Sequence, residues 1–453
     1  MPDANPSPTL YIADILSALS YALDLTEGQP MGHSVRTCLI AMRLGQAINL
    51  PEHDQRDLYF ASLLKDAGCS SNSVRIHKIF GGDELISKRN VKLIDWSSNL
   101  ESIKFAFSNT ERGGTFAMKL QTMLKSLGSP TAVMDGVTKA RCTRGAQIAL
   151  QLGFGKNVAD AIYALDEHWD GKGSPEHKQG DSIPILARIL CLAQTLEVLY
   201  QTFGLDEALA IVRKRTGSWF DPQVTFAAMS LETDSSFWMG ISDSARTQAL
   251  QLETPASVQA ATESDIDQIC EAFASIIDAK STFTGEHSTR VTQYSLALAD
   301  ALEFDEDRRR VVKRAALLHD IGKLGVPNSI LEKPGSLTDE EFAVIKRHPY
   351  HTQEILGHIA GFDRITEVAA AHHERLDGSG YFQGLDASKL DMDMRIIAAA
   401  DVFDALSAKR PYRDALPIAK VMQIMEKESG SGLDETCVEI LRDQFSTPEQ
   451  LAA

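Results

Sequence analysis

The carboxy-terminal half of the chain contains histidines and aspartates whose types and placement suit a metal site. His319 is followed by Asp320, His372 is followed by His373, and both pairs lie beside apolar periodic segments. Imidazole and carboxylate are ligands that first-row divalent metals accept, and adjacent buried imidazoles are costly without a compensating partner. A metal ion is the simplest such partner. The candidate ligands, enough for two cations, are His287, His319, Asp320, His348, His372, His373 and Asp401.

The place of Asp401 supports a bound cation, and one further residue, Lys323, indicates what the metal site would act on. Asp401 ends the apolar run that begins at Arg395, and a buried carboxylate in such a place needs a cation. Lys323 lies one helical turn beyond His319 and can hold a phosphate oxygen. A single buried histidine is more often a hydrogen-bonded core residue than a ligand. Taken jointly, however, the pattern favours metal-dependent chemistry on a phosphate ester.

Helices are expected to position these residues. The apolar residues between Ile266 and Ile277 follow the spacing of a helix face, as do those between Val291 and Leu302. Alternating strand patterns are nearly absent. We therefore predict an all-α fold, with irregular glycine-containing loops at 325–337 and 377–390. The segment 70–130 has mixed character and is not assigned.

The pattern occurs twice along the chain. Residues 61–68 recur as 315–322 at an offset of 254 positions, and residues 167–171 match 374–378 at an offset of 207. Constant offsets over distant matches indicate duplication. The smaller second offset predicts an insertion in the first copy, near 70–130.

This repeat predicts three parts. Residues 1–240 form a helical domain with the insertion, 241–262 form a small, polar linker, and 263–453 form a second helical domain that carries the metal site. Each copy is long enough to fold around its own core.

The first copy lacks most of the candidate ligands. Lys65 stands at the position of His319, and Gln194 stands at the position of Asp401. Such a set cannot hold two cations with any strength. We expect the first domain to be catalytically inactive and Lys65 to pair with Asp66, replacing the lost cation.

Composition excludes several other classes of function. The chain has 45 Lys and Arg against 62 Asp and Glu, a net charge of −17, so it has no general basic surface for a nucleic-acid duplex or an anionic membrane. Its six cysteines contain no Cys-x-x-Cys pair, which is typical of reduced thiols. No signal peptide and no uninterrupted apolar run of spanning length is evident. We therefore expect a cytoplasmic protein.

The motifs within residues 265–445 resemble the signature of HD-GYP domains, a branch of the HD metal-dependent phosphohydrolases. That family has an α-helical bundle with two or three metals, often iron or manganese, and hydrolyses the bacterial second messenger cyclic di-GMP to the linear dinucleotide pGpG or to GMP. The resemblance implies a phosphodiesterase with a degenerate first HD domain. The matching segments are His287, His319-Asp320 with Lys323, His348-Pro349, His372-His373-Glu374, Asp377-Gly378-Ser379-Gly380-Tyr381 and Asp401.

The resemblance also implies a role for each residue. One metal would be held by His287, His319, Asp320 and Asp401, with Asp320 bridging to a second metal held by His348, His372 and His373. The remaining residues would contact substrate. Lys323 would contact the scissile phosphate, and Gly380 and Tyr381 would belong to the loop that binds substrate. Arg410 and Arg413 would contact a guanine or the distal phosphate. Asp320 and Lys323 are thus the expected catalytic residues.

Two positions depart from the family pattern. Phe283 stands where members with three metals have glutamate, so we expect two divalent ions. The resemblance implies iron or manganese as the metal, with nickel or zinc as further possibilities. Phe382 replaces the proline of the Gly-Tyr-Pro motif, which removes a φ constraint from the loop that faces the substrate.

The first functional hypothesis is hydrolysis of cyclic di-GMP. The altered loop keeps a hybrid cyclic GMP-AMP open as the preferred substrate. A protein that binds the dinucleotide without cleaving it, and signals through its first domain as a homodimer or to a partner, is the alternative from another class. The complete ligand set of the second copy argues against it.

Overall fold

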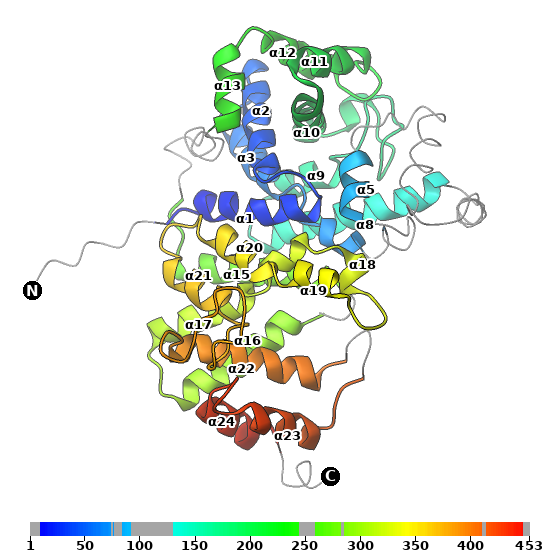
Figure 1. Ribbon diagram of the computed structural model, residues 1–453. Helices are drawn as coiled ribbons and strands as arrows, with labels where there is room; N and C mark the ends of the chain where they lie inside the picture. Colours follow the sequence, from blue (N-terminus) through cyan, green and yellow to red (C-terminus); the bar gives the residue numbers. More distant parts are fainter. Residues whose placement is uncertain are drawn as a thin grey trace, which may run out of the picture. The chain divides into compact units, whose positions relative to one another are not determined.

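The chain is described by a computed structural model in which helices and loops predominate (Figure 1). The described residues contain isolated β-bridges and no β-strand, so the all-α prediction is confirmed for them. Within this part of the chain, every helix is too short or too polar to cross a lipid bilayer. The described residues are 10–73, 76, 84–91, 130–243, 259–281, 285–409 and 414–446.

Two compact units make up the structure, one running from Tyr11 to Ala261 and the other beginning at Thr262. Most of the predicted insertion and linker lies outside the described residues, so the domain boundaries and the linker stay predictions. Phe283, Arg410 and Arg413 also lie outside them.

The second unit is a bundle in which α16, α17 and α22 pack on one another, with α15, α20, α21 and α24 around them. The predicted apolar face of α15 is buried along its whole length, from Ile266 to Ile277. The side chains of Thr262, Asp305, Asp391 and Asp434 cap helix starts by accepting backbone N–H groups. The helices are α15 (Glu263–Asp278), α16 (His287–Ala301), α17 (Glu306–Leu318), η3 (Ile321–Gly325), α18 (Asn328–Leu331), α19 (Asp339–Ile345), α20 (His348–Leu356), α21 (Asp363–Ala370), α22 (Met392–Ser407), α23 (Ile418–Glu428) and α24 (Glu435–Phe445).

One sequence expectation for this unit is wrong in part. The segment 325–337 was expected to be irregular throughout, but it contains the short helix α18. The helix forms because Pro327 precedes it and the side chain of Asn328 is buried, donating a hydrogen bond to the carbonyl of Lys280 at 2.8 Å.

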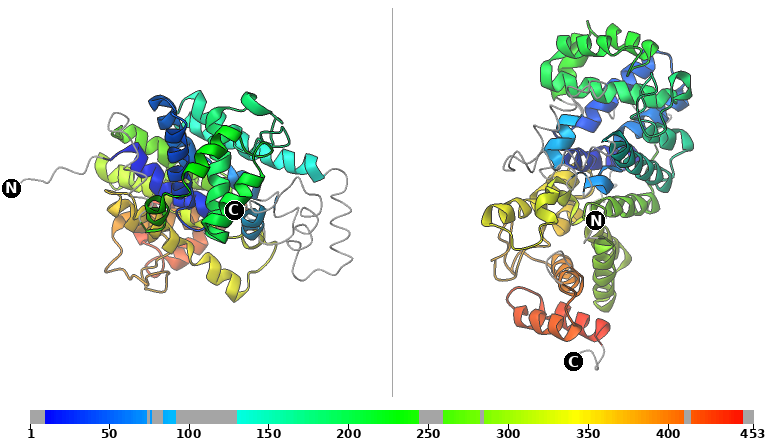
Figure 2. Two further views of the ribbon diagram at one scale, coloured as in Figure 1. Left: turned by 90° about the horizontal axis from the view of Figure 1, so that it is seen from above. Right: turned by 90° about the vertical axis from the view of Figure 1, so that its right-hand side faces the viewer.

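The first unit repeats this arrangement, with α2 packed on α1, α3 and α10. The bounds of α2 and α16 differ by 254 positions, as do those of α3 and α17, and those of α9 and α21 differ by 207. Figure 2 shows both groups of helices from two further directions. The described helices of the first unit are α1 (Ile12–Thr26), α2 (His33–Ala47), α3 (Glu52–Leu64), η1 (Cys69–Asn72), α5 (Glu84–Val91), α8 (Pro130–Gln151), α9 (Lys156–Tyr163), η2 (Gly180–Ser182), α10 (Ile185–Phe203), α11 (Leu205–Lys214), α12 (Pro222–Ser230) and α13 (Ser235–Asp243).

Candidate metal centre

The seven predicted ligands come together inside the second unit. They are contributed by the start of α16, the end of α17, the start of α20, the end of α21 and the middle of α22. Helix ends supply most of them because a side chain at a helix end can turn into the space that neighbouring helices enclose. Ligand atoms within 4.8 Å of one another form three groups: His287 with His319 and Asp401, His319 with Asp320 and His372, and His348 with His372 and His373.

Asp320 lies between two sets of imidazoles. Its Oδ2 atom is 3.4 Å from Nε2 of His287 and 3.5 Å from Nε2 of His319. Its Oδ1 atom is 3.3 Å from Nε2 of His348 and 3.6 Å from Nε2 of His372. Metal ions bind imidazole nitrogen and carboxylate oxygen at about 2.0–2.2 Å. Ligand atoms 3.3–3.6 Å apart could therefore share an ion, and Asp320 faces both sets of imidazoles.

Four of the five candidate histidines are oriented as metal ligands require. The Nδ1 atoms of His319, His348 and His372 each contact the backbone carbonyl three residues earlier, at 2.6–2.7 Å. An Nδ1–H that donates to a carbonyl fixes the neutral tautomer whose Nε2 lone pair is free for a metal. For His287, the Nδ1 partner is the carboxylate of Asp404, at 2.7 Å.

Buried polar atoms in the centre test whether a metal fits. Nε2 of His287, Nε2 of His319 and Oδ1 of Asp320 are buried and form no hydrogen bond among the described residues. Nε2 of His348 and Nε2 of His372 face each other at 3.0 Å. Atoms of this kind are costly to bury unless a cation binds them. The donor set therefore fits divalent metal ions.

The electrostatics of the site favour neutral imidazoles beside ionised carboxylates. Burial lowers the pKa of His319 and of His348 to about 4, so both are neutral near pH 7. Although burial alone would raise the pKa of Asp401, the neighbouring His287 holds it well below its usual value. Ligands in these protonation states bind metal without losing a proton first.

His287 is the exception. Burial acts to lower its pKa, but Asp320, Asp401 and Asp404 surround it and raise the pKa to about 10. Without a metal, both ring nitrogens of this imidazole are therefore protonated at neutral pH, and the ring is positively charged. A cation bound to Nε2 would replace that positive charge.

Asp404 contacts a candidate ligand and Arg290 contacts Asp404, and the sequence analysis missed both. Nε of Arg290 donates to Oδ1 of Asp404 at 2.6 Å, while the other oxygen of that carboxylate accepts from His287. The pair fixes the ring of a candidate ligand, as outer hydrogen-bond partners do in metal sites. Their spacing was a usable signal, because each follows a candidate ligand by three residues, Arg290 after His287 and Asp404 after Asp401.

Lys323 lies at the centre, where its Nζ atom is 2.6 Å from Oδ2 of Asp320. The glycine before it, Gly322, has a packing reason: a Cβ there would lie 2.1 Å from the carbonyl oxygen of His348. This close approach brings η3 against the start of α20. It also places Lys323 beside the carboxylate that faces both sets of imidazoles.

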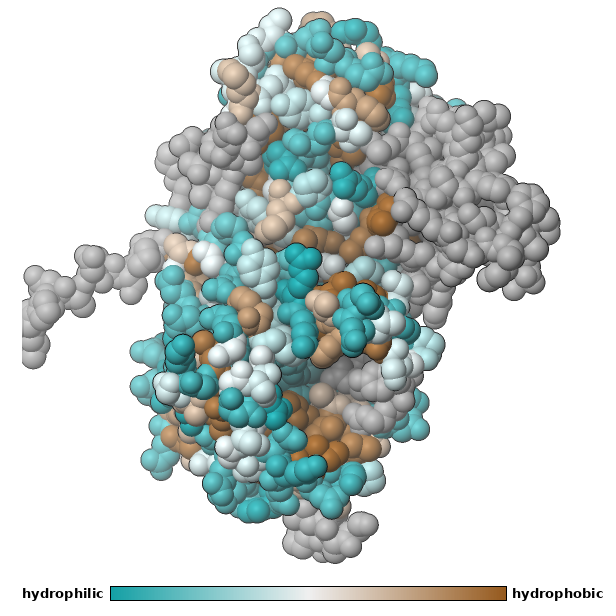
Figure 3. All heavy atoms as spheres, viewed as in Figure 1, coloured by the Kyte–Doolittle hydropathy of each residue, from teal (hydrophilic) through white to brown (hydrophobic). Residues whose placement is uncertain are grey.

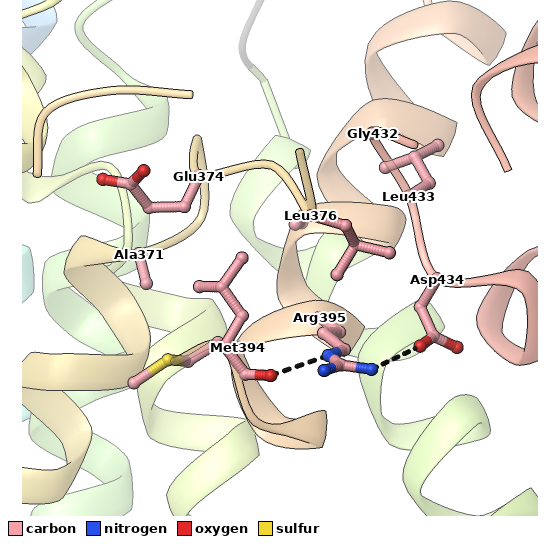
Figure 4. A pocket seen from close by; sticks show the side chains of 10 residues that line it. Ala371, Glu374, Leu376, Met394, Arg395, Gly432, Leu433 and Asp434 are labelled. Atoms are coloured by element: carbon pink, nitrogen blue, oxygen red, sulfur yellow. Dashed lines mark hydrogen bonds and ion pairs between the residues drawn. The ribbon is translucent and has the colours of Figure 1, made fainter. Parts of the chain in front are cut away.

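The loop 377–390 is fixed beside the centre by Glu374, whose carboxylate accepts N–H groups of Gln383, Gly384 and Leu385 at 2.7–3.2 Å. Below it, Arg395 and Asp434 form an ion pair at 3.0 Å beside a small pocket (Figure 4).

Within this loop, the ring of Tyr381 packs on that of His373, with centroids 4.7 Å apart. Gly380 is explained by packing, because a Cβ there would lie 2.6 Å from the carbonyl oxygen of His373. Its predicted contact with substrate stays a prediction. The peptide bond between Tyr381 and Phe382 is cis, as is the Ser174–Pro175 bond at the corresponding place in the first unit.

A helical bundle that encloses a cluster of His and Asp side chains is the arrangement of the HD class, and comparison with known proteins gives the same family. The model of the family described as HD domain matches residues 120–224 and 271–437. The chain belongs to the HD domain family.

Three known proteins to which the chain is similar give further detail. The chain is 39% identical to the 3′3′-cGAMP-specific phosphodiesterase 3 of Vibrio cholerae serotype O1, over 96% of this chain and 94% of that protein. It is 35% identical to the cyclic di-GMP phosphodiesterase response regulator RpfG of Xanthomonas campestris, over 46% of this chain and 56% of that protein. The crystal structure of a cyclic GMP-AMP-specific phosphodiesterase of V. cholerae superposes with a TM-score of 0.69 at 34% identity, covering 98% of this chain and 99% of that one.

Proposed function

We propose that this protein is a metal-dependent phosphodiesterase that hydrolyses cyclic dinucleotides and prefers 3′3′-cyclic GMP-AMP. The observation that carries the proposal is likeness over nearly the full length of both chains to a phosphodiesterase named for that substrate. The complete set of candidate ligands in the second unit supports catalysis rather than binding alone.

Cyclic di-GMP, the substrate expected first from the sequence, is the second candidate. Relatives named as cyclic di-GMP phosphodiesterases are 35% and 37% identical, over 46% and 35% of this chain. These matches cover less of the chain than the match to the cyclic GMP-AMP enzyme does. The shared chemistry is attack of water on a phosphodiester between two nucleosides, giving a linear dinucleotide first.

The proposed roles follow the geometry of the centre. His287, His319, Asp320 and Asp401 would hold one divalent ion, and His348, His372 and His373 would hold a second, with Asp320 shared. Bound there, the two ions would supply Lewis acidity at the phosphate and lower the pKa of a water molecule. Iron, manganese, nickel and zinc all accept imidazole and carboxylate ligands. Iron or manganese is proposed first because the HD-GYP domains that the sequence resembles often use them.

The chain's own residues would prepare the substrate. Lys323 donates to Asp320 at 2.6 Å, and its ammonium group is close enough to bind a non-bridging oxygen of the scissile phosphate. Asp404 accepts from Nδ1 of His287 and holds that ring in place. Since the acidic side chains would be neutralised by metal, a chain of net charge −17 can bind a dianionic substrate.

Rates on three substrates test the proposal. Purified full-length protein loaded with Mn²⁺ or, under anaerobic conditions, with Fe²⁺ would be offered cyclic GMP-AMP, cyclic di-GMP and cyclic di-AMP separately. We expect kcat/KM to be at least about 10-fold higher for cyclic GMP-AMP, equivalent to about 1.4 kcal/mol. A preference for cyclic di-GMP would reverse the order of the two candidates. Tight binding of any dinucleotide without hydrolysis would support the signalling alternative.

A further inference from the structure

A series of aromatic rings runs outward from the metal centre of the second unit. The ring of His373, a candidate ligand, packs on Tyr381 with centroids 4.7 Å apart. Tyr381 in turn meets Phe342 of α19 edge to face, at 6.4 Å. The side chain of Phe342 is 43% exposed, so the series ends at the surface. In Figure 3, hydrophobic residues come to the surface over α18 and α19, beside hydrophilic ones.

Lys346 lies over this series. Its Nζ atom is 4.8 Å from the ring centroid of Phe342 and 5.3 Å from that of Tyr381. Among the described residues, no carboxylate forms an ion pair with this ammonium group, and the side chain is exposed. The three side chains thus form one cationic, aromatic surface beside the site proposed to hold the scissile phosphate.

A second pair of rings adjoins it. Tyr350 of α20, which is 43% exposed, meets Phe382 edge to face at 6.0 Å. Phe382 directly follows Tyr381 in the loop. Exposed aromatic residues of α19 and α20 and half-buried ones of the loop 377–390 thus lie together, all next to the candidate ligands His348 and His373.

We propose that Phe342, Lys346 and Tyr381 form a subsite that binds a purine base and selects guanine over adenine; this rests on the proposed function. In a cyclic dinucleotide, one sugar separates each base from the phosphate, so a phosphate at the metal centre places a base against this surface. Bases stack on aromatic rings whatever their identity. The selection comes from Lys346, because its ammonium group only donates hydrogen bonds.

The edges of the two purines explain that selection. Guanine offers the acceptors O6 and N7 on one edge, whereas adenine offers the acceptor N7 beside an amino donor. A donor-only cation suits the first edge and opposes the second. In cyclic GMP-AMP, which has one of each base, this subsite would fix which nucleoside lies next to α19.

The charge is tested by replacing Lys346 with methionine, which keeps an unbranched side chain one atom shorter and removes the ammonium group. K346M should lower kcat/KM for cyclic GMP-AMP and cyclic di-GMP about 10-fold. For cyclic di-AMP the effect should be smaller, so the guanine preference falls. K346R should restore most of the preference, whereas K420M, at an exposed lysine of α23, should leave all rates as in the wild type. Equal losses on all three substrates would overturn the proposal.

The stacking surface is tested through KM. F342A should raise KM for every cyclic dinucleotide about 10-fold, with a smaller change in kcat, because a stacking contact of the bound base is lost. F342W should retain the wild-type KM. F226A, at a phenylalanine of α12 that is 80% exposed, is the matched control. Circular dichroism and metal content establish that each variant is folded and loaded. An unchanged KM for F342A would refute the subsite.

A binding measurement separates this inference from the proposed function. If wild-type protein hydrolyses no cyclic dinucleotide, the proposed function is wrong, and the subsite is then judged by equilibrium binding of GMP and AMP. Tighter binding of GMP by the wild type, reduced in K346M, supports the guanine subsite. Equal affinity for the two nucleotides, or no effect of K346M, overturns it.

Discussion

The two units of the chain keep the same outer contacts around different centres. In the second unit, Nδ1 of His287 contacts Asp404 at 2.7 Å. In the first unit, Nδ1 of His33 contacts Glu197, and these residues occupy the corresponding positions of α2 and α10. The carboxylate is one methylene longer, but it has the same partner.

The arginine beside each carboxylate is retained as well. Nε of Arg290 and Nε of Arg36 each donate to the carboxylate at 2.6 Å. The terminal nitrogen of each arginine also donates to a backbone carbonyl at 3.0 Å, of Gly285 and of Met31 respectively. Each unit thus fixes the start of one helix against the middle of another with the same three side-chain types.

The centres themselves differ. Where the second unit gathers imidazoles, the first unit places fixed cations: Lys65 pairs with Asp66, and Arg141 pairs with Asp166. The side chains of Lys65 and Asp66 are both fully buried. The ion pair predicted from the sequence is therefore present. The comparison indicates that the contacts among histidine, carboxylate and arginine hold the helices together in both units. The residues inside each centre, imidazoles in one unit and fixed cations in the other, determine whether metal can bind.

The largest expected difference between the units is in catalysis. Asp320→Ala removes the carboxylate that faces both sets of imidazoles, and we expect kcat to fall by more than about 100-fold, since loss of an outer partner alone costs roughly 10–100-fold. Asp66→Asn, at the corresponding position of the first unit, should leave the rate per folded molecule within about twofold. Initial rates on cyclic GMP-AMP measure both. Comparable losses in the two variants would contradict an inactive first unit.

The reverse holds for stability. Lys65→Met leaves Asp66 as a buried carboxylate without its cation, which should lower the free energy of unfolding by about 3–5 kcal/mol. Adding Asp66→Asn to Lys65→Met should restore part of the loss, because the uncompensated charge is then gone. Chemical denaturation followed by circular dichroism measures both variants. If the midpoint of Lys65→Met equals that of the wild type, the pair has no structural role.

The sequence predicted the inner residues better than the outer ones. Four predicted ligands were marked by an adjacent candidate, Asp320 beside His319 and His373 beside His372. The other three were marked by the apolar segments around them and by the resemblance, and all seven come together in the structure. Asp404 and Arg290 were missed because a carboxylate and an arginine on amphipathic helices look like surface residues until the packing is known. The repeat could have identified both residues, because Arg36 and Glu197 of the first copy stand at the positions that correspond to Arg290 and Asp404.

The helical fold was predictable because the apolar spacing of α15 and α16 is regular and the two copies support each other. Short elements were not, as α18 shows: four residues give too little periodicity for a prediction. The surface of Phe342 and Lys346 could not be predicted either. Phe342 lies on α19 and Tyr381 lies in the loop 377–390, and only the folded backbone brings their rings together.

The outer contacts give a third, smaller difference. Asp404→Asn should lower kcat/KM by roughly 10–100-fold, because His287 loses the negative charge that orients and polarises its ring. Glu197→Gln makes the same chemical change in the first unit and should affect only stability. Rates and unfolding midpoints of both variants decide the matter. A catalytic loss in Glu197→Gln as large as that in Asp404→Asn would mean that the two centres act together.

Proton release on metal binding is the smallest effect. With a pKa of about 10 in the absence of metal, His287 is protonated at neutral pH, so a cation that binds Nε2 must displace one proton. The apparent affinity for Mn²⁺ should therefore rise about tenfold for each unit of pH between 7 and 9. His319 and His348, with pKa values of about 4, are already neutral in this range and add nothing. Competition with a chelator measures the slope. An affinity independent of pH would mean that His287 is not a ligand. His287 would then resemble His33 of the first unit fully, since each would contact a carboxylate through Nδ1 without binding a metal.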